Sequence, residues 1–228
     1  MTNSANRRPS MDLQVARREN ARRRAVLLYG VALLGILVLP SPWAAAQPTA
    51  TVEALSVELT EAQRAHLWRV GAWGAANAAA GSALILLSDA GARPGRRAFG
   101  IQAAAWGAIN VGIAVAGLAG SAGAPDSLWA DALGAENTYA DILLVNLGLN
   151  VGYMAVGGTL FAVAGRGVST PDAWRGHGSA LVVQGLGLLV LDGLAYIGTR
   201  ARLDALVDLA GSTALVALPD GVGLVVGL

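Results

Sequence analysis

The stretch 141–164, DILLVNLGLNVGYMAVGGTLFAVA, decides the fold of this chain. Its one charged residue, Asp141, stands at its first position, and the stretch is long enough to cross a bilayer core of ~30 Å at 1.5 Å per residue. Its glycines would weaken a helix in water, whereas in lipid small residues let helix backbones approach one another. The stretch therefore predicts a transmembrane helix.

Three more segments of the same character lie on either side of it, at 67–88, 98–120 and 179–199. Small residues spaced four apart mark interfaces between such helices. Examples are Gly74 with Ala78, Gly112 with Ala116, and Ala116 with Gly120. We therefore expect an all-α integral membrane protein, with a four-transmembrane-helix bundle over 67–199.

The composition agrees with lipid as the main solvent, because 54% of the residues are hydrophobic and 14% are charged. Every basic residue is Arg. From Gln47 onward nine Arg stand against thirteen acidic residues, a formal charge of −4, which argues against a nucleic-acid partner. Cysteine is absent, which excludes disulfides, thiolate metal sites and cysteine nucleophiles.

Residues 1–46 have the order of a secretory signal peptide. An Arg-rich region is followed by an apolar run at 25–39 and a region of small residues, with cleavage expected after Ala46. The run is shorter than the ~20 residues that a spanning helix needs. The alternatives are an uncleaved fifth helix and a true start at Met11. We expect 47–66 to form an extracytoplasmic segment.

The loops predict the topology, because cytoplasmic connections carry an excess of Arg and Lys. The connections before the second and the fourth segment are basic, whereas the connection at 121–140 is acidic and has no basic residue. The basic residues are Arg93, Arg96, Arg97, Arg166 and Arg175. We therefore expect a multi-pass protein of the cell membrane with both mature termini outside the cytoplasm. In a two-membrane bacterium the inner membrane is the default for such helices.

The tail 200–228 is expected outside the cytoplasm. Two apolar β-type runs flank Pro219-Asp220-Gly221, a pattern that is typical of a β-hairpin. An isolated hairpin is marginally stable in water. It would therefore pack on the helices, lie at the membrane surface or meet a partner.

A polar layer is predicted in the outer half of the bundle. Counting the helical rise from each segment boundary puts one polar residue of every helix at a similar depth. These residues are Asn77, Asn110, Asn150 and Asp192, and Asn146 and Tyr153 share the face of Asn150. Secondary candidates that extend the layer toward the cytoplasmic side are Gln102, Gln184 and His177.

Asp192 is the only acidic residue that we expect well inside a segment, where an ionised carboxylate is costly unless it is paired or hydrated. It could belong to a proton or solute site lined by Asn amides. The alternative, which we favour, is interhelical hydrogen bonding that fixes the helix register, at roughly 0.6 kcal/mol per contact. We expect no second charge at this depth that would form a proton relay.

No catalytic, metal or cofactor site is expected. His66 and His177 lie at opposite membrane ends on this topology, so they cannot ligate one haem or metal together. Gly176-His177-Gly178-Ser179 is similar to a catalytic fragment, but residues i and i+2 of a helix point apart and no other helix supplies a base. The Gly-rich stretches lack the patterns of nucleotide-binding loops.

Several motifs make the chain similar to an uncharacterised bacterial family, a domain of unknown function, over about 61–228. The motifs are WGAAN at 73–77, WGAIN at 106–110, NLGLNVGY at 146–153, GHG at 176–178 with Gln184 and Asp192, and PDGVGL at 219–224. The resemblance implies a small four-helix membrane protein with a signal peptide. It implies no activity. The repeated WGA pattern could also record an internal duplication.

We therefore expect a non-enzymatic membrane protein, a structural or accessory bundle in the lipid bilayer. Its Gly/Ala faces and its tail could join it to a second copy or to another membrane protein. The alternative is a small solute or proton-coupled transporter or channel that uses the Asn and Asp layer.

Overall fold

The computed structural model describes residues 51–120, 125–211, 213–218 and 221–226. The chain divides into two compact units, Met1–Pro42 and Trp43–Leu228, and all the described residues belong to the second unit. The predicted signal peptide over 1–46 lies outside the described residues.

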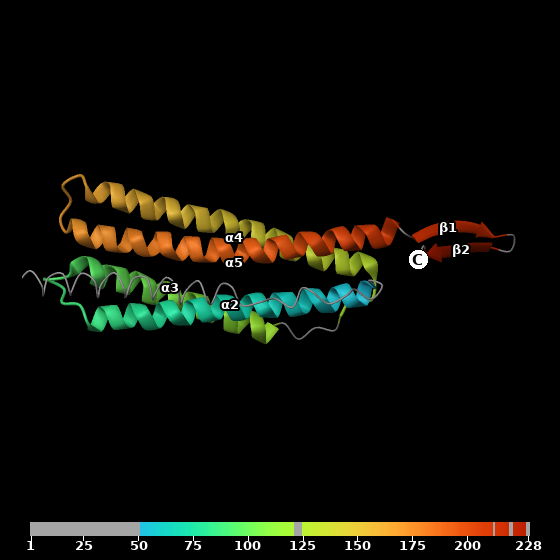
Figure 1. The fold of residues 1–228 in the computed structure, drawn as a ribbon, viewed down its shortest axis with the longest axis horizontal. Coiled ribbons are helices and arrows are strands. Elements are labelled where there is room, and N and C mark those ends of the chain that lie inside the picture. Colours follow the sequence, from blue (N-terminus) through green and yellow to red (C-terminus); the bar gives the residue numbers. More distant parts are fainter. Residues whose placement is uncertain (1–50, 121–124, 212, 219–220, 227–228) are drawn as a thin grey trace, which may run out of the picture. The chain divides into compact units, whose positions relative to one another are not determined.

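Four long helices make up most of the described part of the chain (Figure 1). They are α2 (Val52–Leu86), α3 (Pro94–Gly120), α4 (Trp129–Ala164) and α5 (Pro171–Gly211). Two short strands follow, β1 (Thr213–Leu218) and β2 (Gly221–Val226). They pair antiparallel, with Thr213 opposite Val226 and Leu218 opposite Gly221.

The helices extend beyond the apolar segments seen in the sequence. The first begins at Val52, within the predicted extracytoplasmic segment 47–66, and the last continues to Gly211, within the predicted tail. Apolarity marks where a helix can meet lipid, whereas Glu, Arg, Leu and Ala continue a helix in any solvent. The added turns also bury apolar side chains of α2, α4 and α5 against one another. These side chains are Leu55, Leu59, Ala132, Tyr139, Leu143 and Leu206.

Local hydrogen bonds fix where the helices begin and turn. The Thr51 hydroxyl accepts a hydrogen bond from the backbone N–H of Ala54 at 3.1 Å, which caps α2. In the turn to α3, the Asp89 carboxylate accepts hydrogen bonds from the backbone N–H groups of Ala92 and Gly91, each at 2.8 Å. These bonds, that of Ala92 first, hold the pKa of Asp89 below its ordinary value.

Among the described residues, α3, α4 and α5 are long and apolar enough to cross a membrane. The sequence predicted four such helices, but α2 does not meet this criterion of length and mean hydropathy. The first half of α2 carries Glu53, Glu58 and Glu61, and its second half consists largely of Ala and Gly around the polar Asn77. Small side chains bring close packing to a helix but little hydrophobicity.

The helices pack as two hairpins through close contacts at glycines. Between α2 and α3, a Cβ placed on Gly74 would lie 2.7 Å from the backbone oxygen of Gly107. Between α4 and α5, a Cβ on Gly157 would lie 2.6 Å from the backbone oxygen of Gly178. These glycines are needed because a side chain would push the backbones apart.

The small-residue interfaces expected from the sequence are therefore used only in part. Gly74 lies at the α2–α3 contact, whereas a Cβ on Gly112 or on Gly120 would meet nothing within 4 Å. The Gly112–Gly120 face is thus no interface within the described part of the chain.

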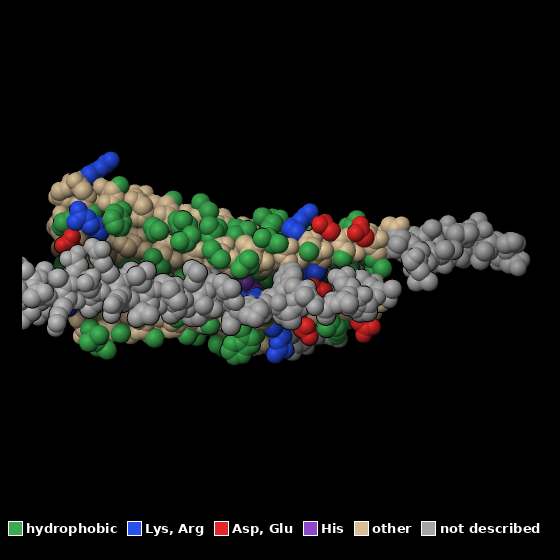
Figure 2. Space-filling view, viewed as in Figure 1, with side chains coloured by type: hydrophobic (Ala, Val, Ile, Leu, Met, Phe, Trp, Pro, Cys, Tyr) green, Lys and Arg blue, Asp and Glu red, His purple; other side chains and the backbone are tan. Residues whose placement is uncertain are grey.

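The two hairpins meet chiefly through α3 with α5 and α2 with α5, and α3 and α4 hardly touch. At the α2–α5 contact, the Trp73 ring lies against Gly187, where a Cβ would have no room. Along the helices many large apolar side chains are exposed, and acidic and basic side chains gather toward the ends (Figure 2). The separation of α3 from α4 leaves the interior accessible from one side.

Candidate functional site

A row of polar side chains joins α2, α5 and α4 inside the bundle. The Nε2 atom of His66 lies 3.1 Å from Oδ1 of Asp192, and the Asn150 amide donates a hydrogen bond to Oδ2 of Asp192 at 2.6 Å. All three residues are buried, with exposed fractions of 6%, 4% and 3% for His66, Asp192 and Asn150. We call them the polar triad. Each oxygen of the Asp192 carboxylate has its own partner, as a buried carboxylate requires.

An apolar cluster separates the polar triad from the end of the bundle where α2 begins. Leu59, Tyr139 and Leu143 pack together there, and Tyr196 covers them from α5. The Tyr139 ring meets the His66 ring edge to face, with 6.4 Å between the ring centroids and an angle of 70°. The cluster closes this side of the contact between His66 and Asp192 with apolar and aromatic side chains.

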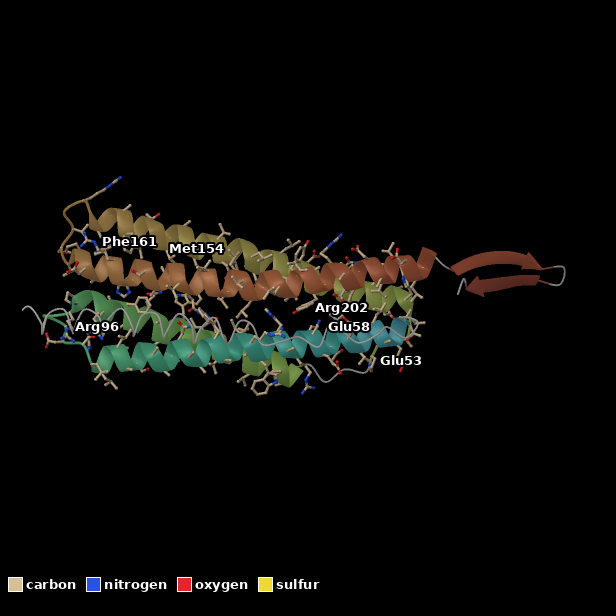
Figure 3. The ribbon with its side chains drawn as sticks, viewed as in Figure 1. Glu53, Glu58, Arg96, Met154, Phe161 and Arg202 are labelled. Carbon is tan, nitrogen blue, oxygen red and sulfur yellow. The ribbon has the colours of Figure 1, made fainter. Side chains whose placement is uncertain are left out.

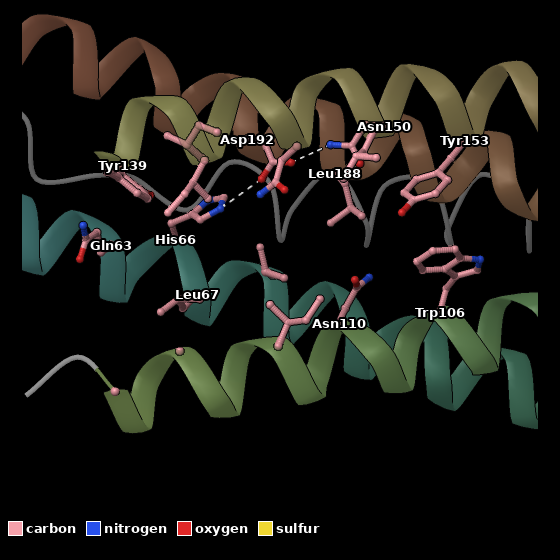
Figure 4. Close-up of a pocket in the computed structure, with 18 residues that line it drawn as sticks. Gln63, His66, Leu67, Trp106, Asn110, Tyr139, Asn150, Tyr153, Leu188 and Asp192 are labelled. Atoms are coloured by element: carbon pink, nitrogen blue, oxygen red, sulfur yellow. Dashed lines mark hydrogen bonds and ion pairs between the residues drawn. The ribbon is translucent and has the colours of Figure 1, made fainter. Parts of the chain in front are cut away.

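A cavity of about 440 Å³ lies beside the polar triad (Figure 4). All four helices contribute to its lining. Besides the triad, its polar lining consists of Gln63, Asn110, Tyr139, Asn146 and Tyr153. The remaining lining is apolar and includes Leu67, Ile113, Leu149 and Leu188. A mostly apolar cavity with a few convergent polar groups is the usual form of a small-molecule site.

The cavity opens sideways, between α3 and α4. Ile113 of α3 and Ile142 and Leu149 of α4 line it and are also 55%, 53% and 48% exposed. At one end the Trp106 ring of α3 and the Tyr153 ring of α4 come together, with 4.7 Å between centroids and an angle of 54°. A molecule could therefore enter from the surface of the bundle without passing through either end.

The cavity gathers most of the polar layer that the sequence predicted. Asn150 and Asp192 are hydrogen-bonded to each other, and Asn110, Asn146 and Tyr153 line the same cavity. The fourth member, Asn77, does not join them. Its amide donates to the backbone oxygen of Trp73, one turn back on its own helix, at 2.8 Å. Asn77 also lies about 16 Å along α2 from His66, at 1.5 Å per residue.

The secondary candidates lie elsewhere in the bundle. Nδ1 of His177 lies 3.2 Å from Oε1 of Gln102, a contact that joins α5 to α3. His177 is about 22 Å along α5 from Asp192, so it shares no site with His66. Gln184 is buried, and its amide has no hydrogen-bond partner among the described residues. None of these three lines the cavity.

The sequence interpretation placed His66 at a membrane end and outside the polar layer, whereas the structure brings it to Asp192. The reason is that the predicted helix began at 67, one residue after His66, whereas α2 begins at Val52. A signal was present in the sequence. The buried residues of α2 follow one helical stripe across that boundary, at Leu55, Leu59, His66, Val70, Trp73 and Asn77.

A second buried ion pair joins α4 to α5, toward the end of the bundle where α2 begins (Figure 3). The Arg202 guanidinium donates to both carboxylate oxygens of Glu136, at 3.0 and 2.9 Å, and to the Thr199 hydroxyl at 3.1 Å. Glu58 of α2 lies 3.9 Å from the same guanidinium. The sequence interpretation missed this cluster too, because it treated these positions as parts of a loop and a tail.

No group of three His, Asp or Glu that could hold a metal ion occurs in the described ranges. His66 and Asp192 offer two ligating side chains, and protein zinc sites use three or four.

The comparison with known proteins rests on one family model. No curated protein and no solved structure matches the chain. The model described as "Family of unknown function (DUF6992)" matches residues 69–193, which is more than half of the chain and includes Asn110, Asn150 and Asp192. The chain therefore belongs to the family of unknown function DUF6992.

Proposed function

We propose that this chain is a non-enzymatic, multi-pass membrane protein whose bundle binds a small molecule taken up sideways from the bilayer. Three helices that are apolar enough to cross a membrane support the membrane assignment. The exposed apolar side chains support it as well, since a soluble monomer rarely exposes continuous apolar surface on this scale.

We propose α2 as the fourth span, because its second half packs along α3 by close backbone contact at Gly74 and Gly81. The connections α2–α3 and α4–α5 lie at the same end of the bundle (Figure 1). Both carry Arg, which supports a cytoplasmic position for that end and an external position for both mature termini. A cleaved signal peptide would give the same orientation.

The single observation that carries the binding function is the side opening of the cavity onto the polar triad. A bundle that served only as a scaffold would gain stability by filling this space, because cavities lose packing contacts. Here an apolar rim leads from the exposed surface to a buried ion pair with its amide partner. The predicted accessory role is compatible with this function, since a binding bundle can also serve a partner.

The test fills the cavity mouth and asks whether a bound molecule is lost. Leu149→Trp adds a ring at the rim, and Val151→Trp adds the same ring at a position that is also exposed, 55%, but outside the lining. Full-length protein is purified from membranes in mild detergent and analysed by native mass spectrometry and solvent extraction. We expect a small molecule to accompany the parent and the Val151 variant, and to be lost from the Leu149 variant.

The proposal fails if nothing accompanies the parent, or if the Leu149 variant retains the molecule to the same extent as the parent. Circular dichroism of both variants checks that the helices are intact.

A second candidate, proton-coupled transport, is favoured by the contact of His66 with Asp192, since two adjacent ionisable groups can exchange a proton. Proteoliposomes that carry an internal pH dye test it with the parent and Asp192→Asn. Equal or absent proton flux in the two would remove this candidate.

A further inference from the structure

The polar triad leaves no unpaired negative charge facing the cavity. Oδ1 of Asp192 is met by His66 and Oδ2 by Asn150. A cationic head group would therefore have to displace one of these two partners from a buried position. An anionic head group would find no Arg among the lining residues, and the Nε2 atom of His66 already meets Asp192. The charge arrangement thus favours a neutral ligand.

Three residues that line the cavity each carry a buried side-chain atom without a hydrogen-bond partner among the described residues. Nδ2 of Asn110, the Tyr139 hydroxyl and Nδ1 of His66 are buried and have no hydrogen-bond partner among the described residues. The amide nitrogen of Asn110 only donates, and a phenol donates readily. Figure 4 shows Asn110 directed from α3 toward the space between the two hairpins, across from Asn150. A ligand that satisfies the Asn110 amide nitrogen must bring an acceptor, such as a carbonyl oxygen.

The shape of the cavity adds a second requirement. Its volume of about 440 Å³ holds a ring-sized head group, and Trp106 and Tyr153 provide aromatic faces at one end. Ile113 and Leu149 continue apolar contact from the cavity to the outer surface between α3 and α4. A tail attached to the head could leave along this route into the bilayer.

We propose, on the basis of the binding function above, that the ligand class is a neutral amphiphile with carbonyl oxygens on its head, of the quinone or cyclic ketone type. Asn110 is the residue that recognises the carbonyl oxygen. The polar triad forms the wall beside the head, and the tail leaves between α3 and α4.

The test compares four probes that share a ten-carbon tail: 2-decyl-1,4-benzoquinone, decylbenzene, decylammonium and decanoate. Their dissociation constants are measured with full-length protein in detergent micelles by native mass spectrometry, and Leu149→Trp gives the background of binding outside the cavity. We expect the quinone to bind about tenfold more tightly than decylbenzene, the ratio that one neutral hydrogen bond to a buried donor provides. We expect the two charged probes to bind more weakly than the quinone.

The Asn110 side chain is tested in the same assay. Asn110→Leu should remove the preference of the quinone over decylbenzene, and Asn110→Gln, which keeps an amide donor, should retain part of it. Melting temperatures show whether each variant is folded. Equal binding of the quinone and decylbenzene to the parent, or tighter binding of a charged probe, overturns the assignment of the head group and leaves the binding function intact. Binding of none of the four above background overturns the ligand class, and the co-purification test described above decides the binding function independently.

Discussion

Replacing Arg202 by Met should cost much more stability than a typical substitution in this chain. The guanidinium makes two hydrogen bonds to Glu136, and the two side chains are 4% and 1% exposed. Without it, the Glu136 carboxylate stays buried with no compensating charge. Removing one partner of such a pair costs about 3–5 kcal/mol, mostly the penalty of the remaining charge.

Two further variants separate this penalty from the strength of the pair itself. The double variant Glu136→Leu with Arg202→Met removes both charges and should recover most of the loss, because apolar residues of similar volume replace buried pairs at little cost. Glu58→Gln should cost at most about 1 kcal/mol, since Glu58 is 53% exposed and 3.9 Å from the guanidinium.

The assay is reversible unfolding in mixed micelles with increasing sodium dodecyl sulfate, followed by circular dichroism. A loss below about 1 kcal/mol in Arg202→Met would refute the reasoning, because the pair would then be hydrated in the folded protein. A double variant no more stable than Arg202→Met would show that the loss comes from packing and not from the buried charge.

Three further predictions concern other parts of the bundle. Gly74→Leu should lower the melting temperature strongly, because its Cβ would lie 2.7 Å from an α3 backbone oxygen. Gly112→Ala should leave the melting temperature unchanged or slightly higher, because a Cβ there meets nothing within 4 Å. Equal melting temperatures of the two variants would contradict the close α2–α3 packing. A double-mutant cycle of His66→Gln and Asp192→Asn should show a coupling energy above about 1 kcal/mol in the same unfolding assay, and additive losses would mean that the contact adds no stability. Asp89→Ala should lower stability near neutral pH, because the hydrogen bonds of the folded turn lower the pKa of Asp89. The stability that Asp89 contributes is present above the unfolded pKa of about 3.9 and is lost as the pH falls through the lower folded value. A stability difference between the two proteins that does not shrink in acid would count against these hydrogen bonds.

Much of the candidate site could be predicted from the sequence because polar residues are conspicuous in apolar segments. Asn110, Asn146, Asn150, Tyr153 and Asp192 were selected in this way, and all of them line one cavity. Helical spacing also predicted that Asn146, Asn150 and Tyr153 share a face. The relative heights of the polar residues along the bundle were predicted less well. Each rise was counted from the boundary of a predicted segment, and the helices extend beyond those boundaries.

The residues that were missed lie where polar sequence was interpreted as the end of a helix. His66, Glu136 and Arg202 are ordinary surface residues by type, and only the packing of the outer turns of α2, α4 and α5 buries them. Asn77 is the opposite case. Its type predicted a place in the polar layer, but its amide donates to the Trp73 backbone oxygen of its own helix.

The sequence by itself determined the helical class, the apolar segments and the candidate polar residues within them, because hydrophobicity and helical periodicity are properties of the local chain. The tertiary structure decided which of those residues meet. That outcome depends on where glycines let two backbones touch and where, between α3 and α4, the helices stay apart. The side opening and the pairing of His66 with Asp192 both follow from this arrangement of the two hairpins, which no local pattern specifies.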